Sequence, residues 1–275
     1  MIIDCHTHLG RNEHVKASVS ELLESMDSAK IDKALVFACD FNDCPNNYLL
    51  SEVKPHRDRL LPVAAIHPHK WKNMTEVLTD SHRIADMYQA GDIVAVKFYT
   101  GYDHYFPGDE LAREYLTDLE DVGCPAIFHM GDCLCSINHA KLKYAQPLGI
   151  DEVAVDYPEM NFIIAHMGNP WVRDTAEVCY KNKNVYTDIS GFVYGKFNSD
   201  DLSNFGKMLD SYMEVAGYGY ADKLLFGTDW PISDQRGYLE ALEWASVTNH
   251  HSKANGIFSP QKMTENAIKA FKLNV

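Results

Sequence analysis

The sequence begins MIIDCHTHLG (residues 1–10), a short apolar run that ends in two histidines one residue apart. Apolar segments of this kind recur along the chain, and segments with helical periodicity separate them. The eight segments span residues 2–5, 33–38, 61–66, 93–98, 125–129, 162–166, 185–188 and 223–226. They are rich in Val, Ile, Phe and Ala, as parallel strands buried on both faces should be. Eight β/α units in one uninterrupted chain predict an α/β fold, a closed (β/α)8 or TIM barrel.

The segments between the strands each carry one apolar stripe, as helices that cover a barrel should. Ser18 and Glu21 have the spacing of a capping box at the start of the first helix. After the last strand, Ser259 and Pro260 predict the start of a further helix over residues 260–271. Because no linker or repeat divides the 275 residues, we expect one domain, residues 1–275, with an additional C-terminal helix.

Composition limits the classes of partner and location. The net charge is −14, with 39 acidic and 25 basic residues and no basic cluster, which argues against nucleic acid and anionic membranes. No apolar run approaches the roughly 18 residues of a membrane helix, and Asp4 interrupts the first one. The seven cysteines suit reduced thiols. We therefore expect a soluble cytoplasmic protein with a small-molecule substrate, either as a monomer or as a homo-oligomer.

In a TIM barrel the active site lies at the C-terminal ends of the strands. Ligand-type or charged residues follow five of the predicted strands, and they are His6 and His8, Lys97, His129, His166 and Asp229. Residues i and i+2 of a strand share a face, so His6 and His8 should both point inward, and Asp4 with them. Taken alone, each histidine is more often a satisfied core residue than a metal ligand, and Asp229 alone could cap a helix. Their joint occurrence at one rim indicates a metal centre.

A set of imidazoles and one carboxylate suits Zn²⁺, with Mn²⁺, Fe²⁺ or Co²⁺ as alternatives. A divalent ion there would lower the pKa of a bound water and polarise a carbonyl. Asp229 is expected to bind the ion and to accept the proton of the attacking water. A histidine that does not bind the ion would stabilise developing charge or move protons.

Four strings together resemble the amidohydrolase superfamily, in particular its amidohydrolase-related (amidohydrolase 2) branch. They are DCHTH (4–8), AIFHMG (126–131), IIAHMGN (163–169) and LLFGTDWP (224–231), and the closing ENAIKAFKL (265–273) is similar to the last helix of that branch. The resemblance implies a metal-dependent enzyme on a (β/α)8 barrel. It further implies that His6, His8, His129 and Asp229 are metal ligands and that His166 is catalytic. Lys97 matches a position that is a carboxylated bridging lysine in some binuclear relatives; we favour one metal and an uncarboxylated Lys97 near the substrate.

Members of this branch either hydrolyse amides and lactones or decarboxylate aromatic and unsaturated acids. The first reaction is our main expectation and the second is the alternative. Residues in the loops after the strands are the expected substrate contacts, and these are Lys97, Arg11, Tyr99, Trp230 and Arg236. The two arginines are candidates to pair a carboxylate, although a surface arginine is the more ordinary explanation of each. The aromatic stretch 99–106 fits a pocket wall and a packed loop equally well.

Overall fold

The computed structural model describes residues 1–13, 15–134, 137, 139–248 and 258–275. Within them eight strands form one parallel sheet in chain order. The strands are β1 (Ile3–His8), β4 (Lys33–Phe37), β5 (Leu60–Ile66), β6 (Ala95–Phe98), β7 (Ala126–Phe128), β8 (Phe162–Ile164), β9 (Val185–Asp188) and β10 (Leu224–Leu225). A short hairpin of β2 (Gly10–Arg11) and β3 (Lys16–Ala17) follows β1.

Backbone hydrogen bonds close the sheet between its first strand and the segment that contains its last. The N–H of Cys5 donates to the carbonyl oxygen of Phe226 at 2.8 Å. The N–H of Asp229 donates to the carbonyl oxygen of His6 at 2.8 Å, and the N–H of His8 to that of Trp230 at 2.7 Å. The predicted TIM barrel is thereby confirmed, and the same bonds bring the strand-one histidines beside Asp229.

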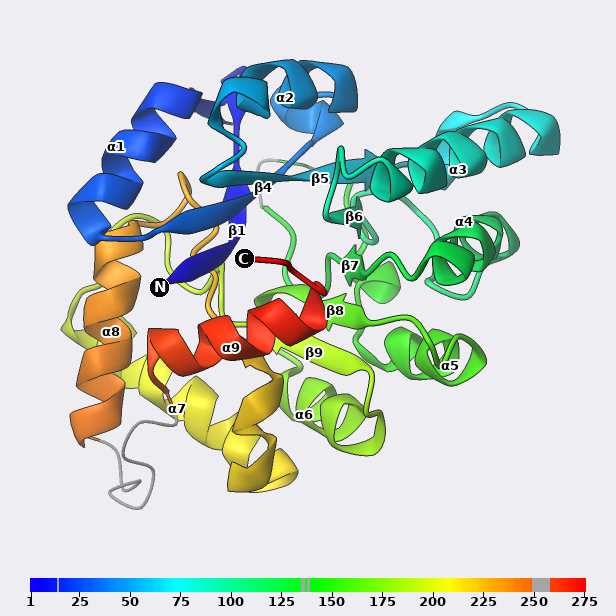
Figure 1. Cartoon of the computed structure of the whole chain (residues 1–275). Helices are drawn as coiled ribbons and strands as arrows, with labels where there is room; N and C mark the ends of the chain where they lie inside the picture. Colours follow the sequence, from blue (N-terminus) through cyan, green and yellow to red (C-terminus); the bar gives the residue numbers. More distant parts are fainter. Residues whose placement is uncertain (14, 135–136, 138, 249–257) are drawn as a thin grey trace.

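Helices surround the barrel and connect its strands (Figure 1). They are α1 (Val19–Ala29), α2 (Asn46–Val53), α3 (Met74–Gln89), α4 (Glu110–Val122), α5 (Leu148–Asp156), α6 (Val172–Lys181), α7 (Ser199–Ala216), α8 (Gln235–Thr248) and α9 (Pro260–Ala270). Ser18 and Glu21 form the predicted capping box, and Ser259 caps α9 as expected. None of the described helices is both long and apolar enough to span a lipid bilayer.

Two apolar cores pack on opposite faces of the sheet. One lies between the sheet and the surrounding helices, and the other fills the barrel interior. The interior core includes Ile3, Leu35, Val63, Ile127, Ala267, Ala270 and Phe271. Ala267 and Ala270 belong to α9, and Phe271 follows it directly. Helix α9 lies across one end of the barrel in Figure 1, where Thr264 accepts a hydrogen bond from the N–H of Ile3 at 2.9 Å. The predicted C-terminal helix therefore covers the end at which the strands begin.

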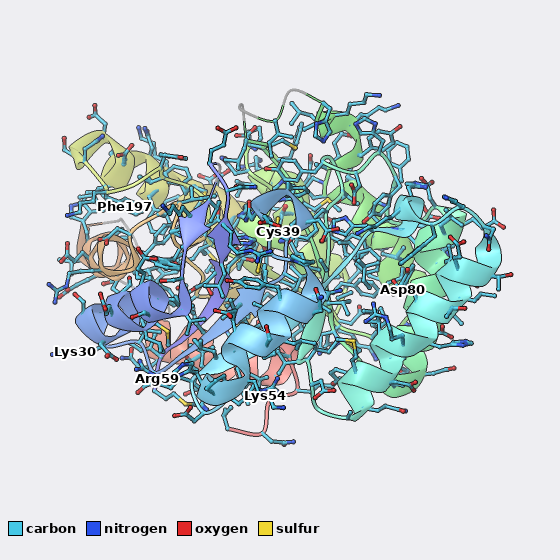
Figure 2. All side chains as sticks on the ribbon, turned by 90° about the horizontal axis from the view of Figure 1, so that it is seen from above. Lys30, Cys39, Lys54, Arg59, Asp80 and Phe197 are labelled. Carbon is cyan, nitrogen blue, oxygen red and sulfur yellow. The ribbon has the colours of Figure 1, made fainter. Side chains whose placement is uncertain are left out.

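Residues that precede a strand and residues that follow it lie at different levels of the molecule (Figure 2). Lys30 and Arg59, which precede β4 and β5, lie low in that view, and Cys39, which follows β4, lies well above them. The loops after the strands therefore form one common rim. This rim is the end at which a TIM barrel carries its active site.

Strand β1 shifts its register with β4 halfway along. From Asp4 to Thr7, β1 advances three residues, whereas β4 advances two, from Ala34 to Val36. An extra residue of this kind re-aims the side chains that follow it. Cys5 consequently packs in the barrel interior, and His6, the next residue, also faces inward. Asp4 does not share that inward face, so our expectation from simple alternation was wrong.

Candidate metal centre

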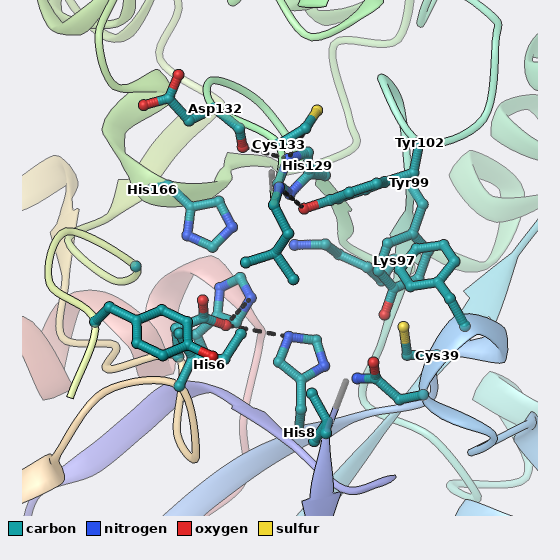
Figure 3. A pocket seen from close by; sticks show the side chains of 18 of the residues that line it. His6, His8, Cys39, Lys97, Tyr99, Tyr102, His129, Asp132, Cys133 and His166 are labelled. Carbon is teal, nitrogen blue, oxygen red and sulfur yellow. Dashed lines mark hydrogen bonds and ion pairs between the residues drawn. The ribbon is translucent and has the colours of Figure 1, made fainter. Parts of the chain in front are cut away.

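His6 and His8, labelled in Figure 3, form a compact group with Asp229 at the C-terminal rim. The ligand atoms of the three residues all lie within 4.8 Å of one another. Asp229 Oδ1 is 3.2 Å from His8 Nε2 and 3.6 Å from His6 Nε2. All three side chains are buried. The group brings together residues that are more than 220 positions apart in the chain, as the closed barrel requires.

The hydrogen bonds of His6 show that this group fits a cation. Asp188 Oδ2 lies 3.0 Å from His6 Nδ1, and because a carboxylate only accepts, the proton of the ring is on Nδ1. The other nitrogen, Nε2, then carries a lone pair and has no hydrogen-bond partner among the described residues. It faces the carboxylate of Asp229. Two acceptors turned toward each other in a buried site are compatible when a cation lies between them.

Burial keeps the imidazoles of His6, His129 and His166 uncharged. It lowers the pKa of His6 well below its usual value, and the positive charge of Lys97 adds to this effect. It likewise lowers the pKa of His166 far below the usual range and that of His129 to about 3. Neutral imidazoles offer the lone pair that a metal ion needs.

His129 and His166 complete the histidine cluster. The ring of His166 lies 4.6 Å from that of His6 and 5.0 Å from that of His129, between ring centroids. His129 Nε2 lies 3.0 Å from the carbonyl oxygen of Asp132, so it stands outside the group formed by His6, His8 and Asp229. His166 follows β8 in a left-handed backbone conformation, with φ 60° and ψ 25°, so β8 ends two residues before the predicted end.

A cavity of about 350 Å³ opens over these residues. Its volume is within the range of small-molecule sites. Its aromatic walls are Phe41, Tyr99, Tyr102, Phe192 and Tyr194. Tyr99 donates its hydroxyl to the carbonyl oxygen of Ala38 at 2.5 Å, so its ring rather than its hydroxyl is offered to the cavity. The aromatic stretch after β6 thus contributes both to the wall and, through the buried Tyr105, to packing.

Lys97 brings a buried positive charge to the same cavity. Its Nζ lies 5.0 Å from the ring centroid of Phe37 and has no hydrogen-bond partner in the part of the chain that is described. Burial lowers its pKa to about 8, while the carboxylates of Asp188 and Asp229 act in the opposite direction. The ammonium is therefore mostly charged at neutral pH. An unpaired buried charge is costly, so the cavity is suited to hold an anionic group beside it.

The two arginines predicted to bind substrate lie elsewhere. Arg11, in β2, donates to the carbonyl oxygen of Asp43 at 2.8 Å and to its carboxylate at 3.0 Å, and it stacks on Tyr48. Arg236 donates to the carbonyl oxygen of Ser28 at 3.1 Å, on the outside of the barrel. Both belong to the surface, because loop residues can turn to nearer acceptors. A role for them in binding the substrate is not supported.

Trp230 also differs from its expected place. It is 9% exposed and packs in the core between the sheet and the helices, although it follows Asp229 directly. Its carbonyl oxygen accepts the N–H of His8 in the bonds that close the barrel. That backbone pairing turns the indole away from the cavity, so the prediction that it contacts substrate is corrected.

Asp188 and Ser190 were missed by the sequence reasoning. Asp188 is the last residue of β9 and, by alternation from Tyr186 in the interior core, it points inward at the rim. The seventh predicted strand therefore ends, like the first, fifth and sixth, at a residue of a type that can bind a metal. Gly191 follows, and a Cβ there would lie 2.5 Å from His166 Nδ1, so only glycine leaves room for that ring.

A curated relative matches part of this chain. Gamma-resorcylate decarboxylase of Polaromonas sp. (strain JS666 / ATCC BAA-500) is 28% identical over 138 residues, which cover 43% of this chain and 36% of that enzyme. The match thus spans little more than a third of the curated relative.

Two solved structures share the fold over 99% of both chains. A probable 2-pyrone-4,6-dicarboxylic acid hydrolase from Acinetobacter baumannii, with bound citric acid, has a TM-score of 0.65 at 16% identity. An amidohydrolase from Burkholderia multivorans with bound zinc has a TM-score of 0.69 at 13% identity. At these identities the similarity shows a shared barrel fold and nothing further. A family model described as amidohydrolase matches residues 3–261, nearly the whole chain, and the chain therefore belongs to the amidohydrolase family.

Proposed function

We propose that this protein is a metal-dependent hydrolase in which an activated water attacks the amide or lactone carbonyl of a small molecule. The observation that carries the proposal is the position of Asp229. Its carboxylate lies 3.2 Å from His8 Nε2 and lines a cavity of about 350 Å³. A carboxylate in this position can share a cation with two imidazoles and still meet a water molecule in the cavity.

The proposed metal ligands are His6, His8 and Asp229, with His129 as a fourth from the neighbouring wall. A single Zn²⁺ is the simplest occupant, and Mn²⁺, Fe²⁺ or Co²⁺ would accept the same nitrogen and oxygen donors. When bound, the ion would polarise the substrate carbonyl and lower the pKa of a coordinated water. Zinc is bound in the related amidohydrolase from Burkholderia multivorans, which supports this choice.

The side chains around the ion would handle protons and orient the substrate. Asp229 accepts the proton of the attacking water on its carboxylate. His166 lines the cavity and has Nδ1 bonded to Ser190 at 2.9 Å, so its Nε2 is available to exchange a proton with the substrate. Lys97 binds an anionic group of the substrate, and the ring of Tyr99 packs against its planar part.

The test uses zinc-loaded protein and a panel of lactones and cyclic amides that begins with 2-pyrone-4,6-dicarboxylate, with ring opening followed by absorbance. Asp229→Asn should lower turnover by about 10²- to 10⁴-fold, the usual effect of removing a general base. Asp234→Asn is the matched control, because Asp234 caps the N–H of Gly237 at 2.8 Å outside the cavity. No ring opening by a zinc-loaded protein across the panel would reject the hydrolase proposal.

Decarboxylation of an aromatic or unsaturated acid is the second candidate. It is favoured by the match to gamma-resorcylate decarboxylase and by the unpaired ammonium of Lys97, which would hold the carboxylate or a neighbouring oxyanion. In this reaction a proton must be delivered to the carbon that loses CO2, and Asp229 is the nearest acid to the proposed ion. Release of CO2 from gamma-resorcylate and related acids, without ring opening of any lactone, would select this candidate.

We also propose that the enzyme works in the cytoplasm and forms a homo-oligomer. The six described cysteines all carry free thiols, which suits a reducing compartment. Light scattering of the purified protein at several concentrations tests the second part, and a single monomeric mass throughout would reject it.

A further inference from the structure

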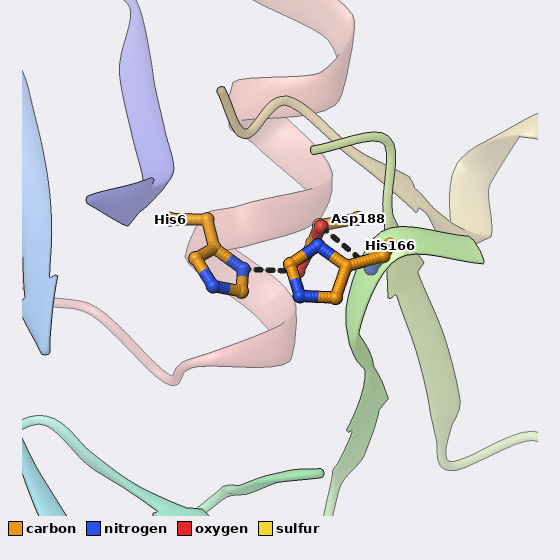
Figure 4. Close-up of side chains that lie close together, drawn as sticks. All are labelled: His6, His166 and Asp188. Atoms are coloured by element: carbon orange, nitrogen blue, oxygen red, sulfur yellow. Dashed lines mark hydrogen bonds and ion pairs between the residues drawn. The ribbon is translucent and has the colours of Figure 1, made fainter. Parts of the chain in front are cut away.

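Strand β9 ends at the rim with Asp188, and Ser190 follows it closely. Both side chains are buried, and Figure 4 shows Asp188 between His6 and His166. We propose that Asp188 and Ser190 are positioning residues that fix the ring tautomers of His6 and His166. In both rings Nε2 then carries a lone pair and no proton. This inference rests on the proposed metal site.

One oxygen of Asp188 is held by three donors. Oδ1 accepts the backbone N–H of His166 at 3.0 Å and that of Ser190 at 3.0 Å. It also accepts the hydroxyl of Ser190 in a very short hydrogen bond. These three bonds fix the rotation of the carboxylate, so that Oδ2 is the oxygen that meets the ring of His6.

The second oxygen sets the tautomer of His6. Oδ2 lies 3.0 Å from His6 Nδ1, and because a carboxylate offers only lone pairs, the ring must donate from Nδ1. The ring N–H at Nδ1 is used in this bond, and Nε2 has no hydrogen-bond partner among the described residues. Nε2 is left with its lone pair directed at Asp229, at 3.6 Å from Oδ1.

Ser190 extends the same effect to His166. Its hydroxyl has one proton, and because a carboxylate only accepts, the hydroxyl donates that proton to Asp188 Oδ1. The serine oxygen is then an acceptor for His166 Nδ1 at 2.9 Å. With the ring proton of His166 donated from Nδ1, its Nε2 is left to the cavity that this side chain lines. The carboxylate of Asp188 thus sets the tautomer of His6 directly and that of His166 through the hydroxyl of Ser190.

Asp188 also supports the backbone of His166. The φ of 60° at His166 lies in the left-handed region, which costs energy for any residue other than glycine. The hydrogen bond from its N–H to Asp188 Oδ1 stabilises this turn. The ring of His166 is therefore placed by the same carboxylate that sets its tautomer.

The first experiment is Asp188→Asn, which keeps the shape of the side chain. The three donors hold the amide oxygen where Oδ1 was, so the amide NH2 faces His6 Nδ1 and drives the ring proton to Nε2. We expect zinc affinity, measured by chelator competition, to fall about 10- to 100-fold, as when a partner of a ligand histidine is lost. Imidazole ¹⁵N shifts of the metal-free, folded protein should report the switch of His6 from Nδ1–H to Nε2–H.

Two further variants separate positioning from stability. Ser190→Ala removes the partner of His166 Nδ1 and a second contact of His6 Nδ1 at 3.1 Å, but it leaves the bond from Asp188 to His6 and the two backbone donors on Oδ1. His166 should therefore lose its single tautomer, while zinc affinity should fall less than in Asp188→Asn. Thr187→Val is the control, because Thr187 is buried in the same strand and donates only to the carbonyl oxygen of Ile164, at 2.7 Å. It should lower the melting temperature and change neither tautomer nor zinc affinity.

The inference is overturned if Asp188→Asn leaves His6 as Nδ1–H with wild-type zinc affinity, or if Thr187→Val weakens zinc binding as much. It is distinguishable from failure of the proposed function. If the wild type binds no zinc, the metal site is wrong, whereas the ¹⁵N shifts of the metal-free protein still decide whether Asp188 and Ser190 set the tautomers.

Discussion

The two ends of the barrel are made from the same strands but have opposite chemistry. Where the strands begin, the interior is filled by apolar side chains and covered by α9 and by Phe271, which follows it directly. Where they end, His6, Lys97 and Asp188 are buried just as deeply but are polar or charged. Two rim residues, His166 and Asp229, also have left-handed backbones, with φ of 60° and 67°.

The two ends therefore contribute different properties, stability at the covered end and chemistry at the rim. Close packing of apolar groups at the covered end stabilises the barrel. The rim bears buried polar groups and strained backbone, which cost on the order of 1–3 kcal/mol for each strained residue and persist only where the surroundings hold them. A change at the covered end should therefore alter stability, and a change at the rim should alter chemistry.

Phe271→Ala is expected to give the largest effect, at the covered end. Removing a fully buried phenylalanine should lower the free energy of unfolding by about 3–5 kcal/mol, because a cavity remains in the interior core. Denaturant unfolding measures this loss. Metal content and turnover per folded molecule should stay at wild-type values, and their loss in the folded variant would contradict the division between the two ends.

Gly191→Ala should show the converse behaviour at the rim. The new Cβ would lie 2.5 Å from His166 Nδ1, and the displaced ring should cost about 10²-fold in kcat, as small misplacements of catalytic groups do. Gly195→Ala is the matched control, since its φ of 79° is similar to the 69° of Gly191 but its Cβ would meet nothing within 4 Å. Equal loss of kcat in both variants would mean that backbone strain, and not the ring of His166, is responsible.

Lys97 should give a smaller effect that depends on pH. Its pKa of about 8 means that its charge is lost as the pH rises through that value, so the affinity for an anionic inhibitor should fall there by about tenfold. The Lys97→Met variant should bind the inhibitor weakly at every pH, with no change of affinity near pH 8.

Folding stability should also depend on Lys97. Because its pKa is below the usual 10.5, the unfolded chain binds more protons between pH 8 and 10.5, and stability should rise with pH over that window.

Arg11→Ala is the control for the measurement of inhibitor affinity. Its guanidinium is half exposed and paired with Asp43, so its removal should leave inhibitor binding unchanged and alter stability by about 1 kcal/mol at most. A loss of inhibitor affinity in this variant would restore Arg11 as a substrate contact.

The comparison of the two ends also explains what the sequence could predict. Strand positions and the inward direction of His8 follow from apolar runs and alternation, which are local properties of the chain. The register shift in β1 is not local, because it depends on pairing with β4, and it moved Asp4 off the inward face. The contact between His6 and Asp188 joins residues 182 positions apart, so only the closed barrel reveals it.

Loop residues were the hardest to predict. Arg11 and Trp230 lie beside His8 and Asp229 in the sequence, but nearby hydrogen-bond acceptors and the closing backbone bonds turn them away from the cavity. No periodicity fixes the direction of a loop side chain. Asp188, in contrast, ends a correctly predicted strand, and applying the strand-end rule to all eight strands would have found it.

The most direct test of the account is the metal content of the purified protein and of His6→Ala, with His82→Ala on the exposed face of α3 as the control. His6 belongs to both groups of metal-ligand atoms found among the described residues. The account predicts about one equivalent of a divalent metal in the wild type and in His82→Ala, and almost none in folded His6→Ala. Full metal content in His6→Ala, or no metal in the wild type under any loading condition, would contradict it.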